Sequence, residues 1–308
     1  MRSSKLNILP SNPELNSQKG VNPGRFPSWL HRKMPKGGNL FKTSEALDKN
    51  RLHTVCEEAR CPNLPECWSR KTATFLTMGK TCTRNCGFCS IDFTKAPAPL
   101  EIDEPQRTAD AVKALGLKHV VLTMVARDDL PDGGAHHLKL IVEEIRRTNA
   151  ETTIEILTSD FEGNKEAWEI VLEISPEIFN YNLETVRALT PRVRHKATYD
   201  RTLEFLNYIH QKSSKILVKS GMMLGLGEKE EEVQEAFRDL KNAGCSIVTL
   251  GQYLQPDQHK LLVKEFITPE TFKKYEDYGH SIGISQVYAG PFIRSSYNAD
   301  LILKRLQL

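Results

Sequence analysis

Short apolar runs alternate with amphipathic segments along most of this chain. The first run, at 72–78 (TATFLTM), is followed by a helix-like pattern at 104–116 that has a proline near its start and a glycine at its end. A second run, at 119–125 (HVVLTMV), precedes another helical pattern at 135–149. Short runs rich in β-branched residues are typical of strands that are buried on both faces. The pattern therefore predicts strands and helices in alternation.

The same alternation continues to about residue 290 and gives about six or seven strand–helix units. Such alternation predicts a parallel sheet with helices packed against it. The sheet could be open and doubly wound, or it could close into a full or partial (β/α) barrel. Either closure gathers functional groups at the carboxyl ends of the strands. Polar or glycine-rich loops follow four of the predicted strands, at 126–134, 182–185, 225–228 and 251–256.

The first 50 or so residues differ from the rest of the chain, because they contain five prolines among many Asn, Ser, Gly and Lys. We expect an extended segment there, draped over the main body or partly disordered. No apolar stretch of the signal-peptide kind opens the chain. We therefore expect a cytoplasmic protein, with import into an organelle left open.

Composition excludes several classes of function. The 308 residues are 39% hydrophobic and 26% charged, as in ordinary globular proteins. A net charge of +3, without a run of Lys and Arg, does not match a nucleic-acid-binding protein. It leaves room for a modest preference for an acidic protein partner. No run approaches the roughly 18 apolar residues of a membrane span.

Cysteines are the unusual feature of the composition. Their odd number and tight clustering argue against a disulfide framework and favour metal-bound thiolates in a reducing compartment. The lone Cys245 is expected to be a small buried hydrophobic residue. The other six form two triplets: Cys56, Cys61 and Cys67, spaced C-x4-C-x5-C, and Cys82, Cys86 and Cys89, spaced C-x3-C-x2-C.

The second triplet in the chain directly follows the first predicted strand. Zinc sites usually pair one C-x2-C with a second pair of Cys or His ligands, and no such pair follows here. Three thiolates suit a 4Fe-4S cluster in which one iron remains open to a small molecule. A zinc-stabilised binding module without catalysis is the alternative of a different class.

With Phe88 before its last cysteine, the run Cys82, Cys86 and Cys89 resembles the signature of the radical S-adenosylmethionine enzymes. The resemblance implies a partial (β/α) barrel of about six parallel strands with extensions at both ends. It also implies that the open iron chelates S-adenosylmethionine, and that electron transfer from the cluster gives a 5′-deoxyadenosyl radical. These three cysteines would then be the catalytic centre. The glycine-rich GMMLGLGE at 221–228 fits a second family pattern, with Met223 in place of the usual Ile.

The resemblance further implies a set of contacts to S-adenosylmethionine. Each contact has a structural alternative, such as a strand-ending turn or the N-terminal acid of a helix. Arg127 could likewise serve the cofactor or the substrate, and the neighbouring Asp128 and Asp129 could equally form a loop-stabilising turn. The expected cofactor-binding residues are Thr123, Asn182, Glu184, Arg194, Gly225 and Glu228.

The triplet Cys56, Cys61 and Cys67 is again one ligand short. Together with further matching stretches between about residues 51 and 300, it resembles the sulfur-inserting branch of the superfamily that acts on a protein-bound octanoyl group. The resemblance implies a second 4Fe-4S cluster whose fourth ligand is a serine oxygen of the RSSY motif at 294–297. We expect Ser296, with Ser295 as the alternative.

The implied reaction inserts two sulfur atoms, at carbons 6 and 8 of an octanoyl-lysine, to give lipoyl-lysine. The second cluster would be consumed as the sulfur donor. The implied partners are octanoylated lipoyl carrier domains (2-oxoacid dehydrogenase E2 subunits and the glycine cleavage H protein), an electron donor such as flavodoxin or ferredoxin, and an iron–sulfur carrier. Biotin-synthase-like or methylthiotransferase-like chemistry is the alternative. It is disfavoured by the N-terminal triplet combined with RSSY.

The resemblance also divides the chain into three parts. Residues 1–70 would carry the cysteines of the second cluster, 71–290 would form the barrel, and 291–308 would close the second cluster through RSSY.

Overall fold

One sheet of eight strands forms the centre of the fold in the computed structural model, which describes residues 26–31, 39–70, 72–297 and 299. Its strand order is β1-β2-β5-β6-β7-β8-β9-β10, and every neighbouring pair is parallel except β1 with β2. The strands are β1 (His53–Thr54), β2 (Thr74–Thr77), β5 (His119–Met124), β6 (Thr153–Leu157), β7 (Ile178–Asn180), β8 (Leu217–Leu224), β9 (Ile247–Gln252) and β10 (Gln286–Gly290).

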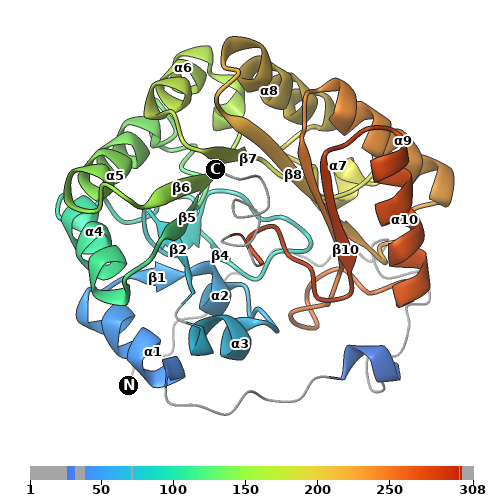
Figure 1. Cartoon of the computed structure of the whole chain (residues 1–308), viewed down its shortest axis with the longest axis horizontal. Coiled ribbons are helices and arrows are strands. Elements are labelled where there is room, and N and C mark those ends of the chain that lie inside the picture. The colour runs from blue at the N-terminus through green and yellow to red at the C-terminus, as the bar shows by residue number, and fades with distance from the viewer. Residues whose placement is uncertain (1–25, 32–38, 71, 298, 300–308) are drawn as a thin grey trace.

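Helices surround this sheet on the outside, as Figure 1 shows in a view down the barrel. Each has an apolar face that packs inward, and several begin at a side-chain cap, such as Asn164, Thr198 and Thr268. The outer helices are α4 (Glu104–Leu115), α5 (Ala135–Thr148), α6 (Lys165–Ile174), α8 (Tyr199–Lys212), α9 (Glu230–Asn242) and α10 (Pro269–Ser281).

The strand order confirms a partial (β/α) barrel, because β1 and β10 stand at the two ends of the sheet. Seven parallel strands are present where about six were expected. Their central residues are buried on both faces, which explains their nearly continuous apolar sequences. One exception is the ion pair of Glu155 and Lys219, whose carboxylate and ammonium lie 2.9 Å apart with no solvent exposure. It links β6 to β8, and Asn180 on β7 also donates to Glu155.

The N-terminal part is more ordered than the sequence indicated. We expected an extended segment to about residue 50, but α1 (Asn39–Lys49) is a three-turn helix that packs on α3 (Leu64–Ser69). Between them, α2 (Val55–Glu58) follows β1, which pairs antiparallel with β2. What was expected of residues 1–25, of 32–38, of 298 and of 300–308 lies outside the described residues.

Short elements complete the fold around the strand ends. Two of them, β3 (Thr81–Cys82) and β4 (Asp92–Phe93), form a small parallel ladder that encloses the cysteine loop. The others are η2 (Ser28–Leu30), η3 (Phe161–Gly163) and α7 (Thr190–Val193).

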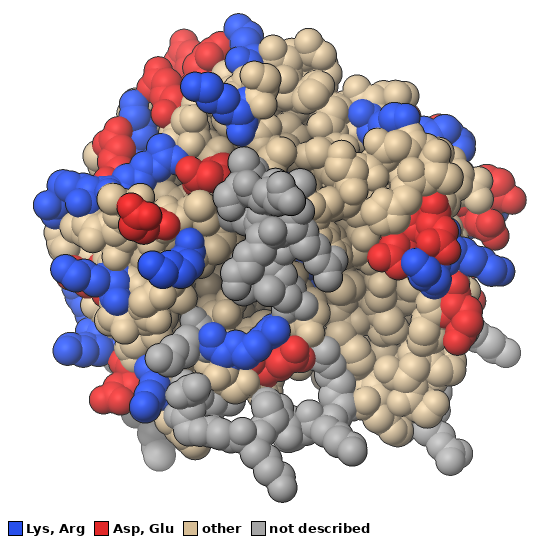
Figure 2. Space-filling model, in the orientation of Figure 1, with Lys and Arg blue, Asp and Glu red and all other residues tan. Residues whose placement is uncertain are grey.

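Charged side chains of both signs are interspersed over the outer helices on the face shown in Figure 2, and neither sign dominates it. This distribution agrees with the small net charge of +3. Within the described ranges, no helix combines the length and apolar character that crossing a membrane requires.

Candidate functional site

A cavity of about 480 Å³ opens where the parallel strands end, and both cysteine segments reach it. Its walls come from the last residues of β5, β6, β8 and β9, as expected for a parallel barrel. Many of these residues are apolar, among them Met124, Leu157 and Met222. Among the predicted ligands, the lining includes Cys56, Cys61, Cys82, Cys86, Cys89, Ser295 and Ser296.

The loop of Cys82, Cys86 and Cys89 is held by backbone hydrogen bonds to the barrel. The Cys82 sulfur accepts from the backbone N–H groups of Arg84 (3.4 Å) and Ala126 (3.3 Å). Farther along the loop, Gly87 donates to the Val193 carbonyl at 2.9 Å. A side chain at Gly87 would press on Leu261, because an added Cβ would lie 3.0 Å from that side chain. The loop is therefore closely packed between the end of β5 and α7.

Burial controls the protonation of these thiols. Burial, with a smaller contribution from the neighbouring thiols, raises the pKa of Cys86 to about 12 and that of Cys89 to about 11. Iron must therefore displace protons on binding, as is usual for thiolate sites. Among the described residues, no three Cys, His, Asp or Glu side chains group closely enough to hold a single metal ion. Three soft thiols around a large cavity fit a cluster better than a lone zinc ion.

Four of the six expected cofactor-binding residues line the cavity: Thr123, Asn182, Glu184 and Arg194. Asn182 donates to the Glu184 carboxylate at 3.0 Å, and its own buried side-chain oxygen has no hydrogen-bond partner among the residues that the structure describes. Glu184 adopts a left-handed backbone conformation (φ 68°), which is uncommon for a residue with a side chain. Burial raises the pKa of Glu184, although the nearby Arg194 guanidinium opposes that shift. A buried carboxyl and an orphaned amide oxygen are suited to binding the polar groups of a ligand.

Arg194 is only 4% exposed and is directed to protein oxygens. Its guanidinium donates to the carbonyls of Asn182 and Ala197 and to the hydroxyls of Tyr181 and Thr202. It therefore organises the segment after β7 as well as lining the cavity. Whether it also binds a cofactor carboxylate stays a prediction.

The other two residues, Gly225 and Glu228, follow β8 but lie outside the cavity lining. The Glu228 carboxylate accepts from the N–H groups of Gly225 and Leu226, so it caps its own turn. Gly225 has a positive φ of 100°, and a Cβ there would lie 2.3 Å from the Gln252 side chain. These contacts give the turn a structural purpose, and the cofactor role of both residues stays a prediction.

Arg127 and Asp128, whose roles the sequence left open, lie in the loop after β5. Arg127 turns away from the cavity and pairs with Asp129, with Nε and Nη2 each 2.8 Å from a carboxylate oxygen. It is 2% exposed and also donates to the Met78 carbonyl, which supports a structural role. Asp128 instead pairs with Arg84, inside the cysteine loop. Arg84 could not be recognised from the sequence, because a lone Arg between cysteines carries no pattern.

The triplet Cys56, Cys61 and Cys67 lies on α2, α3 and the turn between them. Thr54 caps α2 by accepting from the Glu57 N–H, and the Cys61 N–H donates to the Cys56 carbonyl at 2.9 Å. Burial raises the pKa of Cys56 to about 12 and that of Cys67 to about 11, and the neighbouring thiols add to both shifts. Cys67 is close enough to Cys61 to sense its charge, although it lies outside the cavity lining.

The RSSY segment reaches this triplet through contacts that span most of the chain. Asn63, 1% exposed, donates to the Phe292 carbonyl at 2.7 Å, and the Tyr297 hydroxyl donates to Glu66 at 2.8 Å. Both Asn63 and Glu66 stand between Cys61 and Cys67 in the sequence. We call these two contacts the N–C clasp. Sequence patterns could not reveal it, because its partners are 229 and 231 positions apart.

Both serines of RSSY face the cavity, but their partners differ. The Ser295 hydroxyl accepts from Asn182 at 3.4 Å. Among the described residues, none is hydrogen-bonded to the Ser296 hydroxyl. Within the described part of the chain, Ser296 therefore has fewer hydrogen-bond partners than Ser295. Its ligand role is not tested by this geometry.

Comparison with known families matches both parts of the site. Residues 76–240 match the model of the radical SAM superfamily, and residues 4–61 match the N-terminal domain of lipoyl synthase of that family. Among curated proteins, a lipoyl synthase of Protochlamydia amoebophila is 63% identical over 306 residues, covering 99% of this chain and 95% of that protein. One of Chlamydia felis is 52% identical over 283 residues, covering 92% and 90%.

Solved structures show the same fold at low sequence identity. Streptococcus suis SuiB bound to S-adenosylmethionine superposes with a TM-score of 0.56 at 14% identity, covering 74% of this chain and 53% of that one. The hydrogenase maturase HydG of Carboxydothermus hydrogenoformans gives a TM-score of 0.53 at 16% identity, covering 76% and 65%. These likenesses support the partial barrel and nothing finer.

Proposed function

The chain belongs to the lipoyl synthase family of the radical S-adenosylmethionine superfamily, and on this premise we propose which of its residues perform which part of the reaction. The family's enzymes are sulfurtransferases that convert a protein-bound octanoyl group into a lipoyl group, using S-adenosylmethionine and two 4Fe-4S clusters. The single observation that carries our assignment is the shared cavity, which both cysteine segments and the RSSY serines line.

We assign Cys82, Cys86 and Cys89 as the ligands of the catalytic cluster. Cys56, Cys61 and Cys67, with Ser296 as the fourth ligand, would hold the cluster that provides sulfur. With S-adenosylmethionine bound, the first cluster would supply a carbon-centred radical that can remove hydrogen atoms from carbons 6 and 8. The second cluster would supply the sulfur atoms that replace them. No general base could remove a proton from an unactivated alkyl carbon, so radical chemistry is required.

The chain's own contribution is to bind, orient and exclude water. The apolar wall that includes Met124, Leu157 and Met222 suits an octanoyl chain, because aliphatic carbons gain free energy on leaving water. Thr123, Asn182 and Glu184 offer polar groups along the same wall and support a cofactor-binding role. Gly225 and Glu228 would act by shaping the turn after β8. A hydroxyl is a harder and weaker iron ligand than a thiolate, so Ser296 would release its iron more readily.

Partners and location extend this proposal. The substrate is an octanoyl-lysine on a lipoyl carrier domain, and we propose E2 subunits and the glycine cleavage H protein as its sources. A flavodoxin or ferredoxin would deliver electrons, and an iron–sulfur carrier would rebuild the second cluster. We propose the cytoplasm as the compartment, and the division into 1–70, 71–290 and 291–308 as the functional parts.

A turnover assay tests the proposal directly. Anaerobically purified chain is supplied with octanoylated carrier domain, S-adenosylmethionine and a reductant, and the carrier is read by mass. We expect a mass gain matching two sulfur atoms in place of two hydrogens, and about eight irons and eight sulfides per chain from two clusters. One or two zinc ions without acid-labile sulfide would instead identify a metal-stabilised binding module.

A further inference from the structure

We propose that Arg84 is a positioning residue for the reaction, because its guanidinium fixes the loop of Cys82, Cys86 and Cys89 relative to the loops that line the cofactor side of the cavity. This inference rests on the proposed function, since it assumes that the loop holds the catalytic cluster. It goes further by assigning a role to a residue that contacts neither the cluster nor the substrate in our account.

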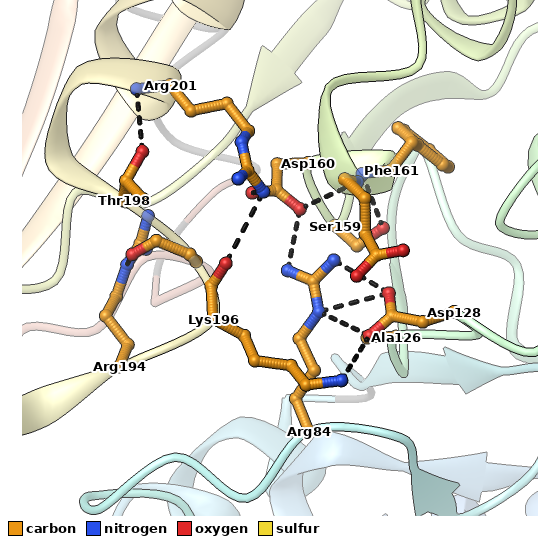
Figure 3. Close-up of polar contacts among 12 residues, drawn as sticks. Arg84, Ala126, Asp128, Ser159, Asp160, Phe161, Arg194, Lys196, Thr198 and Arg201 are labelled. Carbon is orange, nitrogen blue, oxygen red and sulfur yellow. Dashed lines mark hydrogen bonds and ion pairs between the residues drawn. The ribbon is translucent and has the colours of Figure 1, made fainter. Parts of the chain in front are cut away.

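Arg84 lies between Cys82 and Cys86 in the sequence, and its guanidinium enters an ion-pair network with Asp128 and Asp160 (Figure 3). Its Nε and Nη2 atoms donate to the Asp128 carboxylate at 2.9 and 2.7 Å, which is a bidentate pairing. The remaining Nη1 lies 2.6 Å from Asp160. Side-chain exposure is 6% for Arg84, 9% for Asp128 and 0% for Asp160. Lysine could not reproduce this geometry, because only a planar fork meets two carboxylates along fixed directions.

The network joins four segments that surround the cavity. Asp128 follows β5, and its backbone N–H donates to the Thr83 hydroxyl in the cysteine loop at 3.0 Å. Asp160 follows β6 directly after Ser159, which lines the cavity. Asp160 also accepts from Arg201 at 3.0 Å, and Arg201 donates to the Lys196 carbonyl next to Arg194. Among the described residues, Thr83 and Arg84 thus connect the cysteine loop to this network, and Arg84 is the charged one of the two.

The network also bears on the cluster through the Cys82 sulfur. Backbone N–H groups of Arg84 and Ala126 donate to that sulfur. Arg84 carries the guanidinium itself, and Ala126 lies in the same loop as its partner Asp128. Three cations (Arg84, Arg201 and Lys196) face two carboxylates, which leaves a local charge of +1. Hydrogen bonds to sulfur and nearby positive charge both favour the reduced cluster. Loss of the guanidinium is therefore expected to make the reduction potential more negative.

The test uses Arg84→Lys and Arg84→Gln in the full chain, with Arg201→Gln as the matched control. Arg201→Gln removes a cation from the same Asp160 but lies outside the cysteine loop. Three properties are measured after anaerobic reconstitution: iron content, the reduction potential followed by electron paramagnetic resonance, and kcat and KM for S-adenosylmethionine cleavage without octanoyl substrate. Because that cleavage does not consume the second cluster, it isolates the first site.

We expect Arg84→Gln to raise KM for S-adenosylmethionine by about ten- to hundredfold and to make the potential more negative. Arg84→Lys should restore the charge and part of the potential, but not the KM, because the fork is still missing. Arg201→Gln removes the same unit of charge, so it should make the potential more negative as well, but it should leave the KM near the wild-type value because the Arg84 fork stays in place. A thermal melt of each protein checks that the variants fold.

Several outcomes would overturn the inference. Wild-type potential and KM in both Arg84 variants would show that the network does not act on the cluster. Equal losses of iron in the Arg84 and Arg201 variants would indicate a general stability effect. If the wild-type chain itself holds no iron–sulfur cluster, the proposed function fails first, so the two failures are distinguishable.

Discussion

Cys82, Cys86 and Cys89 lie on a loop that leaves the barrel at β3 and returns at β4, whereas Cys56, Cys61 and Cys67 lie on short helices beside the sheet edge. The first loop is fastened to strand ends of the barrel through Ala126 and to α7. The second triplet contacts the RSSY segment through the N–C clasp, whose partners are at opposite ends of the chain.

This difference suits the two roles that we assign. A catalytic cluster must return to the same geometry in every turnover, and a loop built into the barrel provides that. A sulfur-donating cluster must be dismantled and rebuilt, and its closing segment meets the triplet through the side-chain hydrogen bonds of the N–C clasp. Those contacts can open without unfolding the barrel, because local stability follows the number of buried interactions.

Removing one cysteine from each triplet should give the largest effect and the clearest separation. Cys82→Ala should abolish both 5′-deoxyadenosine formation and lipoyl product, because the catalytic cluster loses a ligand. Cys61→Ala should spare some 5′-deoxyadenosine formation but yield no lipoyl product. Chromatography of the nucleoside and mass spectrometry of the carrier measure the two outcomes. Lipoyl product from the Cys61 variant would refute the assigned sulfur donor.

Gly251 offers a way to displace the RSSY segment without touching a ligand. A Cβ at this position would lie 2.1 Å from the Ile293 carbonyl, so the backbone before Arg294 must move. We expect Gly251→Ala to lower lipoyl formation by up to about a hundredfold, the effect of a roughly 1 Å misplacement, while 5′-deoxyadenosine formation changes little.

Gly290→Ala is the matched control for Gly251→Ala. Gly290 pairs with Gly251 across β10 and β9, but its added Cβ would meet the Ile293 side chain at an ordinary 3.4 Å. It should keep both activities. Equal loss of both activities in Gly251→Ala would mean that the substitution damages the barrel and not the second site alone.

These variants also show where sequence patterns succeed and fail. The parallel sheet with outer helices follows from alternating apolar runs and amphipathic helices, which are local signals. Its closure into a partial barrel and the proposed cluster ligands were implied by the family resemblance that the cysteine spacings carry. Gly251 carries no such signal, since its importance comes from the approach of a backbone 42 positions later. The same holds for Arg84, whose two carboxylate partners belong to the loops after β5 and β6.

One error and one untested prediction have a related cause. The proline-rich composition before residue 50 indicated extended chain, but α1 forms because its apolar face packs on α3 and α4. Tertiary packing thus outweighed local composition. Glu228 fitted a family pattern, yet its carboxylate caps the turn at Gly225 and Leu226, and only coordinates reveal which acceptor a carboxylate serves.

Weakening the N–C clasp should have a smaller effect than displacing the RSSY segment through Gly251→Ala. Tyr297→Phe removes the hydrogen bond to Glu66, which is worth about 1 kcal/mol, or a factor of about five. We expect the second cluster to lose iron to a chelator about fivefold faster, with the first cluster unaffected. Tyr278→Phe is the control, because its hydroxyl bonds to Arg238 on the outer helices. Equal acceleration in both variants would show that the clasp does not guard the site.

A fall in pH should distinguish the Arg84–Asp128 ion pair from the N–C clasp, and this is the smallest of the expected effects. Burial alone would raise the pKa of Asp128, but Arg84 holds it below its usual value. A lowered folded-state pKa stabilises the protein above the unfolded pKa of about 4, and that stabilisation is lost as the pH falls through the folded value. Between about pH 6 and pH 3.5, the metal-free wild type should therefore lose up to about 0.7 kcal/mol more unfolding free energy in urea than Asp128→Asn, whose amide does not titrate. Asn63→Ala removes a neutral donor of the N–C clasp, so its destabilisation relative to wild type should be the same at both pH values. A pH-dependent loss in Asn63→Ala would mean that charge also holds the second site, and the contrast between the two fastenings would then fail.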